Sequence, residues 1–196
     1  MTVVLDYGMG NLRSVQKAVE FLGHECKIQT DLSGATRVII PGVGAFGAAM
    51  ERIAPLAGEI EAFVRSGRPL LGICLGQQLL FERSEEHGGC TGLGVIPGTV
   101  KYLQKGEGCK VPNIGWSSIS PREGSLLLKG TGENEQVYFV HSLYTDCTDA
   151  NDVAATAEHS VTFTAAVERG NVWATQFHPE KSGTVGLNIL RNFLEC

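Results

Sequence analysis

The segment 70–80, LLGICLGQQLL, places one cysteine between two glycines. Cys74 stands in the pattern G-x-C-x-G, which at a strand-to-helix turn forms a nucleophile elbow and presents the side chain at the end of a sheet. The glycines leave room for so sharp a turn, and the start of a helix favours the thiolate. A buried, inert thiol is the alternative. The two glycines and the strand-to-helix switch together favour a reactive cysteine.

A cysteine nucleophile needs a base, and one of the five histidines has a suitable neighbour. His178 ends an apolar stretch in the segment FHPEKS, where Pro179 favours an extended conformation at the histidine. Residues i and i+2 of an extended chain project to the same side, so Glu180 can orient the imidazole. The sequence therefore predicts a triad of Cys74, His178 and Glu180, with a solvated turn as the alternative for HPE. His141 is predicted to be a core or strand-end residue.

Acyl transfer also needs backbone N–H groups that stabilise an oxyanion. In nucleophile elbows the residue after the nucleophile supplies one donor, here Leu75, and a loop after an earlier strand supplies another. The segment PGVGAF (41–46) follows an apolar stretch, so Gly42, Val43 and Gly44 are predicted to form that loop. Glycines on both sides of Val43 would let its peptide units rotate toward or away from the cysteine. An ordinary Gly-Pro turn is the alternative.

The elements that must position these residues alternate between strand and helix. Apolar stretches predict strands over 2–6, 26–30, 37–40 and 69–73. Amphipathic stretches predict helices over 12–22, capped by Asn11, and over 45–53, 57–66 and 76–84. This alternation indicates parallel strands with crossover helices on both faces.

The second half has a different pattern, in which short strands predominate. Strands are predicted over 94–103, 137–145, 152–159, 163–170 and 171–177, and a final helix over 185–195. The sequence thus predicts a single α/β domain over residues 1–196. Its central sheet is mostly parallel, flanked by helices and interrupted by a nucleophile elbow, with mixed or antiparallel strands in the second half.

Composition excludes several functional classes. The chain has 196 residues and a net charge of −5, so it has no overall basic character for binding nucleic acid or an anionic membrane. Its apolar runs are too short to span a bilayer, and the segment after Met1 has no leader pattern. Six cysteines occur without paired or metal-ligand spacing. We therefore expect a cytoplasmic protein with reduced thiols and no metal site.

The motifs PGVGAF, LLGICLGQQLL and FHPEKS resemble those of the triad (class I) glutamine amidotransferases. Members of that family release ammonia from glutamine and pass it to a synthase. The segments DYGMGNLRSV, VPNIGW and YFVHSLY are similar to those of the glutaminase subunits of imidazole glycerol phosphate synthase, in histidine biosynthesis. The resemblance covers nearly the whole chain, with the motifs in the family's order.

The resemblance implies a substrate and the residues that hold it. L-glutamine would form a thioester with Cys74 without a metal or organic cofactor. Gly44, Gln78 and the main chain of Ser142 and Leu143 would hold its amino-acid end. Gln78 is one helical turn from Cys74 and would lie on the same face.

The resemblance also implies a partner, a cyclase subunit with a (β/α)8-barrel fold that makes imidazole glycerol phosphate and an aminoimidazole carboxamide ribonucleotide. The two chains would form a heterodimer. Asn11, Trp116, Tyr138 and Lys181 would face the cyclase. This chain has Asn113 and Ser117 where the family usually has histidine and asparagine.

Three alternatives remain open at this point. The chain could be a glutaminase subunit for another synthase, or a stand-alone cysteine hydrolase of the same fold, which would not need Gln78. It could also be a nucleotide-binding module, because DYGMGNL follows the first predicted strand. A dinucleotide fingerprint needs a third glycine where Arg13 stands, although Asp31 lies roughly where a ribose-binding acid would.

Overall fold

Strand β4 (Leu70–Cys74) lies in the parallel part of a large sheet in the computed structural model, which describes residues 1–106 and 108–196. The strands of this parallel part are, in sheet order, β2 (Cys26–Gln29), β1 (Thr2–Leu5), β3 (Arg37–Gly42), β4 and β13 (Val172–Thr175). The last strand of the chain, β13, is thus hydrogen-bonded to β4. The carboxyl ends of β3, β4 and β13 consequently meet at one edge.

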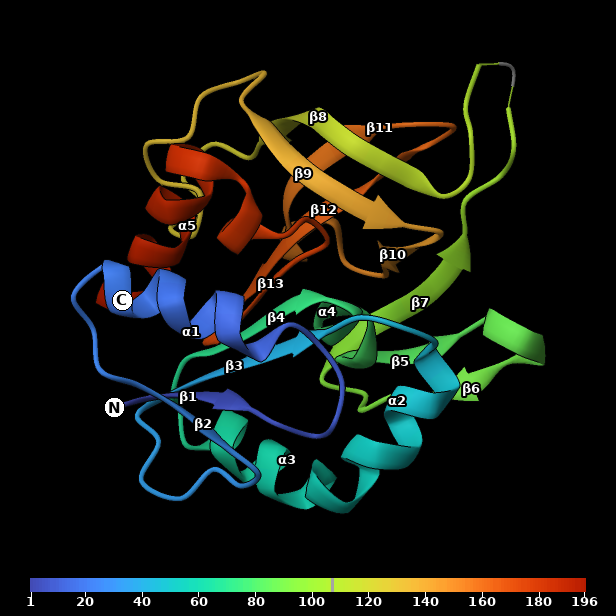
Figure 1. The fold of residues 1–196 in the computed structure, drawn as a ribbon. Helices are drawn as coiled ribbons and strands as arrows, with labels where there is room; N and C mark the ends of the chain where they lie inside the picture. The colour runs from blue at the N-terminus through green and yellow to red at the C-terminus, as the bar shows by residue number, and fades with distance from the viewer. Residues whose placement is uncertain (107) are drawn as a thin grey trace.

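The sheet continues from β13 mainly with antiparallel pairs (Figure 1). In sheet order these strands are β12 (Thr162–Arg169), β10 (Leu143–Cys147), β7 (Ile96–Tyr102), β5 (Phe81–Ser84) and β6 (Cys90–Thr91). A branch from β12 runs through β11 (Val153–Glu158), β8 (Asn113–Pro121) and β9 (Gln136–His141). The predicted fold class, parallel first and mixed later, is confirmed.

Helices cover both faces of the parallel strands (Figure 1). They are α1 (Leu12–Phe21), α2 (Phe46–Ile53), α3 (Ala57–Arg65), α4 (Leu75–Leu79) and α5 (Gly183–Glu195), with the short 3-10 helices η1 (Ala54–Leu56), η2 (Glu86–Gly88), η3 (Ala150–Asp152) and η4 (Pro179–Lys181). Because side chains alternate along a strand, Val4 packs with α1 and α5, whereas Val3 and Leu5 pack with α2 and α3. Asn11 caps α1, as predicted, by accepting a hydrogen bond from the Ser14 N–H. Within the described ranges no helix is long and apolar enough to cross a membrane.

The helix predicted over 76–84 is wrong beyond Leu79. Helix α4 ends there, and residues Phe81–Ser84 form strand β5 beside β7. The carbonyl of Leu80 accepts hydrogen bonds from the Val95 and Ile96 N–H groups instead of continuing a helical ladder. Tertiary hydrogen bonding and the burial of Phe81 therefore override a locally helical pattern.

The strand predicted over 137–145 is divided in two, and two strands, the short β6 and the longer β8, were not predicted. β9 pairs with β8, whereas β10 pairs with β7 and β12, so the chain changes partners at Ser142. Strand β8 was not predicted because two of its apolar residues, Ile114 and Trp116, point outward and are exposed. Its opposite face carries Asn113, which is buried.

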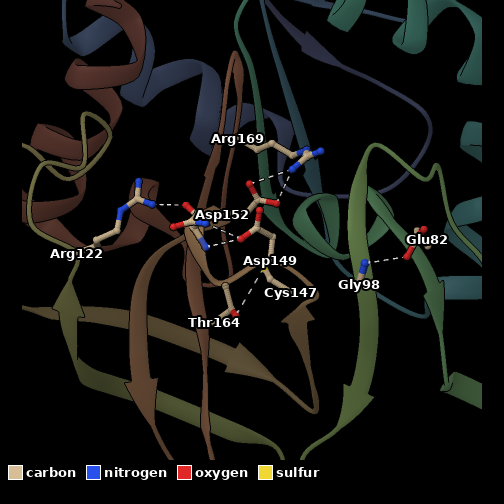
Figure 2. A network of polar contacts seen from close by, with 9 residues as sticks. Glu82, Gly98, Arg122, Cys147, Asp149, Asp152, Thr164 and Arg169 are labelled. Carbon is tan, nitrogen blue, oxygen red and sulfur yellow. Dashed lines mark hydrogen bonds and ion pairs between the residues drawn. The ribbon is translucent and has the colours of Figure 1, made fainter.

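Polar contacts fasten the loop between β10 and β11 to the sheet (Figure 2). Arg169 of β12 donates to both carboxylate oxygens of Asp152, at 3.1 and 2.8 Å, and Arg122 donates to the Asn151 carbonyl. Asp149 accepts from the Asn151 backbone and side-chain amides. A further contact, from the Gly98 N–H to Glu82, joins β7 to β5. These contacts stabilise the antiparallel half without involving Cys74.

Helix α4 crosses the end of β3 at unusually close range. A Cβ atom added at Gly76 would lie 1.8 Å from the carbonyl oxygen of Ile40, a backbone atom that cannot move aside on its own. Gly76 is therefore required by the approach of the helix to the strand. This approach sets the angle at which the chain leaves β4.

We expect Gly76→Ala to lower the free energy of unfolding by about 3 kcal/mol or more, because β3 and α4 must separate to admit the methyl group. Gly58→Ala is the matched control, since Gly58 lies in helix α3 with open space around its Cα. That change should leave stability unaltered or raise it by up to about 1 kcal/mol. Urea denaturation of both variants tests the expectation, and equal stabilities would contradict it.

Candidate active site

Cys74 occupies a strained turn between β4 and α4. Its φ and ψ are 56° and −111°, a conformation that is rare for residues other than glycine and persists only where the surroundings impose it. Gly42, at the end of β3, pairs with Cys74 in register. A Cβ at Gly42 would lie 2.4 Å from the Tyr7 hydroxyl and 2.9 Å from Leu75 Cβ. The structure thus contains the elbow and packs the predicted oxyanion loop against it.

His178 and Glu180 come together just beyond β13. Nδ1 of His178 lies 2.8 Å from Oε1 of Glu180, and their side chains are only 3% and 1% exposed. His178 is extended, as the following proline predicts, but Glu180 lies in the 3-10 helix η4. The His178 N–H donates to the carbonyl of Tyr138, and the Ser182 hydroxyl donates to the His178 carbonyl. These backbone contacts fix the imidazole position.

The electrostatic surroundings of His178 favour its charged form. Burial lowers the pKa of His178, but the nearby polar groups of Cys74 and Glu180 and their negative charges raise it by more, to about 9. Among the residues that the structure describes, Nε2 of His178 is buried and has no hydrogen-bond partner within normal geometry. Cys74 also raises the pKa of the buried Tyr7, although burial is the larger cause. A buried imidazole held by a carboxylate beside a thiol can shuttle a proton.

A cavity of about 280 Å³ opens beside the Cys74 side chain. Seven of the predicted site residues line it: Val43, Gly44, Cys74, Leu75, Gln78, Ser142 and Leu143. Four further residues line it that the sequence did not indicate, namely Glu86, Pro112, Val140 and His141. Glu86 could not be found from sequence because it lies in the short helix η2, outside every recognised motif. The cavity matches the size of a small polar molecule.

Gln78 and Glu86 give this cavity two hydrogen-bond acceptors. Nε2 of Gln78 donates to the Leu143 carbonyl at 3.1 Å and to Oε1 of Gln176 at 3.0 Å, so both amide hydrogens are engaged. Oε1 of Gln78 therefore remains for a ligand. Glu86 accepts a hydrogen bond from the Phe46 N–H and adds a carboxylate to the lining. The two acceptors suit an ammonium group.

His141 and Asn113 form a buried pair next to the cavity. Nδ1 of His141 lies 2.8 Å from the Leu143 carbonyl oxygen, and Nε2 lies 3.1 Å from Nδ2 of Asn113. Burial is the main reason that the pKa of His141 is lowered to about 4, with the charges of His159 and His178 acting in the same direction. His141 is thus buried at the end of β9, as predicted, and its low pKa keeps it neutral. Asn113 points inward to it and away from the surface.

Three of the residues expected to face a partner form an exposed cluster. Trp116 is 54% exposed and packs edge-on against Tyr138, with ring centroids 6.1 Å apart. Nζ of Lys181 lies 5.8 Å from the centre of the Tyr138 ring. Asn11 is exposed at the start of α1, a helix that packs against η4. We call Trp116, Tyr138 and Lys181 the Trp116 cluster; its exposed tryptophan is typical of a binding surface.

The glycine-rich loop after β1 packs against other parts of the chain. A Cβ at Gly10 would lie 3.2 Å from Gly42 backbone atoms, and one at Gly8 would lie 2.5 Å from the Arg52 guanidinium. These glycines therefore allow the loop to approach β3 and α2. That packing role accounts for DYGMGNL without a bound nucleotide.

Comparisons with known proteins agree with this arrangement. Residues 3–196 match the family "Glutamine amidotransferase class-I". A protein of Syntrophotalea carbinolica, "Imidazole glycerol phosphate synthase subunit HisH", is 49% identical over 98% of both chains. The Arabidopsis thaliana protein "Imidazole glycerol phosphate synthase hisHF, chloroplastic" is 46% identical over 99% of this chain and 34% of that protein. A crystal structure of a glutamine amidotransferase, 23% identical, superposes with a TM-score of 0.77 over 99% of this chain and 97% of that chain, which shows the shared fold.

We expect Glu180→Gln to lower the pKa of His178 from about 9, because glutamine keeps a hydrogen-bond acceptor but removes the negative charge. The native pKa lies above the ordinary value of 6.5. Protonation of His178 therefore stabilises the fold fully below pH 6.5, and this stabilisation is lost as pH rises through about 9. NMR titration of the imidazole measures the change, with the exposed His87 as internal control. An unchanged His178 titration would show that Glu180 does not hold its charge.

Proposed function

The chain belongs to the glutamine amidotransferase class-I family, and from this premise we propose how its residues carry out the reaction. It is the glutaminase subunit of an imidazole glycerol phosphate synthase, in histidine biosynthesis. L-glutamine is hydrolysed to glutamate and ammonia, and the ammonia passes to the cyclase subunit. The observation that supports the residue roles is the strained Cys74 beside the buried His178–Glu180 pair, at a cavity lined by Gln78.

Cys74 is the proposed nucleophile, and His178 the acid and base. The Cys74 thiolate attacks the side-chain carboxamide carbon of glutamine, which forms a C–S bond and an oxyanion. The His178 imidazolium gives its proton to the departing nitrogen as the C–N bond breaks, leaving ammonia and a γ-glutamyl thioester. Neutral His178 then takes a proton from water, which attacks the thioester and releases glutamate and the thiolate. Glu180 stabilises the charged imidazole throughout.

We assign the oxyanion contacts to the main chain of Leu75 and of the loop formed by Gly42, Val43 and Gly44. Gly44 has a φ of 120°, and Val43 is exposed, so the peptide units that follow Gly42 have room to rotate. Gly42 itself is held by its pairing with Cys74. Loss of one such donor typically lowers the rate by about 10²–10³, so rotation of one peptide unit could control activity.

The amino-acid end of glutamine is proposed to lie against Gln78. Its Oε1 and the Glu86 carboxylate accept from the substrate ammonium, whereas Gly44 and the main chain of Ser142 and Leu143 hold the carboxylate end. This arrangement directs the carboxamide toward Cys74. A stand-alone hydrolase for other amides would have no use for two acceptors in this place.

The partner is the cyclase subunit, which we propose to be a (β/α)8 barrel in a heterodimer with this chain. The Arabidopsis relative supports a close association, because its name joins both subunits and this chain matches only 34% of it. Asn11 and the Trp116 cluster are proposed to contact the cyclase. All six cysteines are free, which supports the cytoplasmic location that we propose.

We expect Cys74→Ala to abolish glutamine hydrolysis while the fold remains intact, because the attacking sulfur is lost. Cys196→Ser is the matched control, since Cys196 is an exposed free cysteine, and it should retain full activity. An electrophilic glutamine analogue should label Cys74 alone in the assembled enzyme, as read by peptide mass spectrometry. Labelling at another cysteine, with Cys74→Ala still active, would refute the proposed nucleophile.

Lys181→Ala should weaken assembly with the cyclase and lower glutamine-dependent turnover by about fivefold or more, the effect of losing on the order of 1 kcal/mol at an interface. The isolated chain should stay folded, because Lys181 is exposed. Lys27→Ala removes another exposed lysine, which forms an ion pair with Glu25, and should change neither quantity. Titration with the purified cyclase and a coupled assay measure both. If Lys181→Ala assembles and turns over glutamine like the wild type, Lys181 has no role in the interface.

A further inference from the structure

Gln176 places its side-chain amide against the proposed nucleophile. The residue directly follows β13, is 0% exposed, and is anchored by a hydrogen bond from its backbone N–H to the Ala165 carbonyl. Nε2 of Gln176 lies 3.7 Å from Sγ of Cys74, within range of an N–H···S hydrogen bond. The reaction described above gives this buried amide no role.

The orientation of the Gln176 amide follows from its neighbours. The Leu143 carbonyl can only accept, so Nε2 of Gln78 must be the atom that faces it at 3.1 Å. The second hydrogen on that nitrogen then requires an acceptor, which is Oε1 of Gln176 at 3.0 Å. Nε2 of Gln176 is thereby turned toward Cys74. Exchange of its oxygen and nitrogen would break the contact with Gln78 and bring an oxygen to the sulfur.

The His141–Asn113 pair reaches the same carbonyl, that of Leu143. Nδ1 of His141 must carry the proton that reaches the Leu143 carbonyl, so its Nε2 accepts from Asn113. The carbonyl oxygen of Leu143 thus receives two donors, which uses both of its lone pairs. Each amide and ring around this carbonyl therefore has one permitted orientation, and the contact between Gln78 and Gln176 leads from the carbonyl to the sulfur.

The Cys74 sulfur meets two different groups in its two protonation states. As a thiol it can donate to the Val140 carbonyl, 3.9 Å away, whereas a thiolate can only accept. Helix α4 has only five residues, so little helix dipole is available to stabilise the negative charge. A fixed N–H donor is the more effective group here, because hydrogen bonds to charged acceptors are the stronger ones.

We infer that Gln176 is a further catalytic residue, whose Nε2–H donates a hydrogen bond to Sγ of Cys74, stabilises the thiolate and fixes the direction of its attack. The inference rests on the proposed function, because it assumes that the thiolate is the attacking group. It also connects glutamine binding to the nucleophile, since Gln78 holds Gln176 in place.

Alkylation of Cys74 by iodoacetamide tests this role in the full-length chain without glutamine. Gln176→Met should slow alkylation of Cys74 about tenfold near neutral pH, equivalent to about 1.4 kcal/mol, because less thiolate is present. The two rates should converge in strongly alkaline buffer, where the thiol is ionised in both proteins. Gln77→Met is the matched control: Gln77 is equally buried, but its Nε2 donates to Thr145 and not to the sulfur. That variant should react like the wild type.

An unchanged rate in Gln176→Met, or slowing by one factor at every pH, would overturn the inference, because only loss of thiolate depends on pH in this way. Should Gln176→Met fail to fold, NMR of the wild-type chain decides. The side-chain amide signal of Gln176 should shift as the thiol ionises and stay fixed in Cys74→Ala; equal behaviour in both overturns the inference. Neither readout needs glutaminase activity, so a wild-type chain that is inactive even with its cyclase would refute the proposed function and leave this result intact.

Discussion

The Ile40 carbonyl lies so close to Gly76 that α4 can start only in the direction that a left-handed Cys74 allows. A backbone conformation of this kind costs on the order of 1–3 kcal/mol and needs rigid surroundings. The apolar side chains of β4 supply them, because Leu70, Leu71 and Ile73 are essentially inaccessible to solvent. The same turn brings the Leu75 backbone and the loop at Gly42 beside the sulfur. Strain at one residue thus sets the position of the whole site.

Buried polar groups around this turn divide into two kinds. Gln78, Gln176, His141 and Asn113 are hydrogen-bonded to one another or to backbone, which makes them rigid. By contrast, Nε2 of His178 is buried without a partner of normal geometry in the described structure. Buried polar atoms in folded proteins are usually paired, so an unpaired one invites a functional explanation. The rigid groups hold Nε2 of His178 in place, and its free hydrogen-bonding capacity suits the proton transfer that we propose.

Local motifs were enough to predict strands β1 to β4 of the parallel part and to propose the triad. The elbow glycines and the order His-Pro-Glu are contiguous in sequence, and their geometry is set by backbone sterics that any chain obeys. What sequence could not supply depends on contacts between distant segments. The local pattern of residues 81–84 favours a continuing helix, but in the fold the carbonyl of Leu80 accepts a hydrogen bond from the Val95 N–H and these residues form β5. The tryptophan of strand β8 is exposed to solvent, which hides the strand's pattern. The contact of Gln176 with Cys74 depends on the pairing of β13 with β4, which no local motif indicates.

Strand β13 lies between β4 and β12 in the sheet, although strands β5 to β12 separate it from β4 in the sequence. Domains form as the ribosome delivers them, beginning at the amino terminus. An incomplete nascent chain can therefore pair β1 to β4 and form the elbow, but its sulfur still lacks the histidine, the glutamate and the glutamine that follow β13. Cys74 consequently meets Gln176, His178 and Glu180 only after the ribosome has passed β13. A chain that stops before β13 therefore has the cysteine without the groups that we propose activate it.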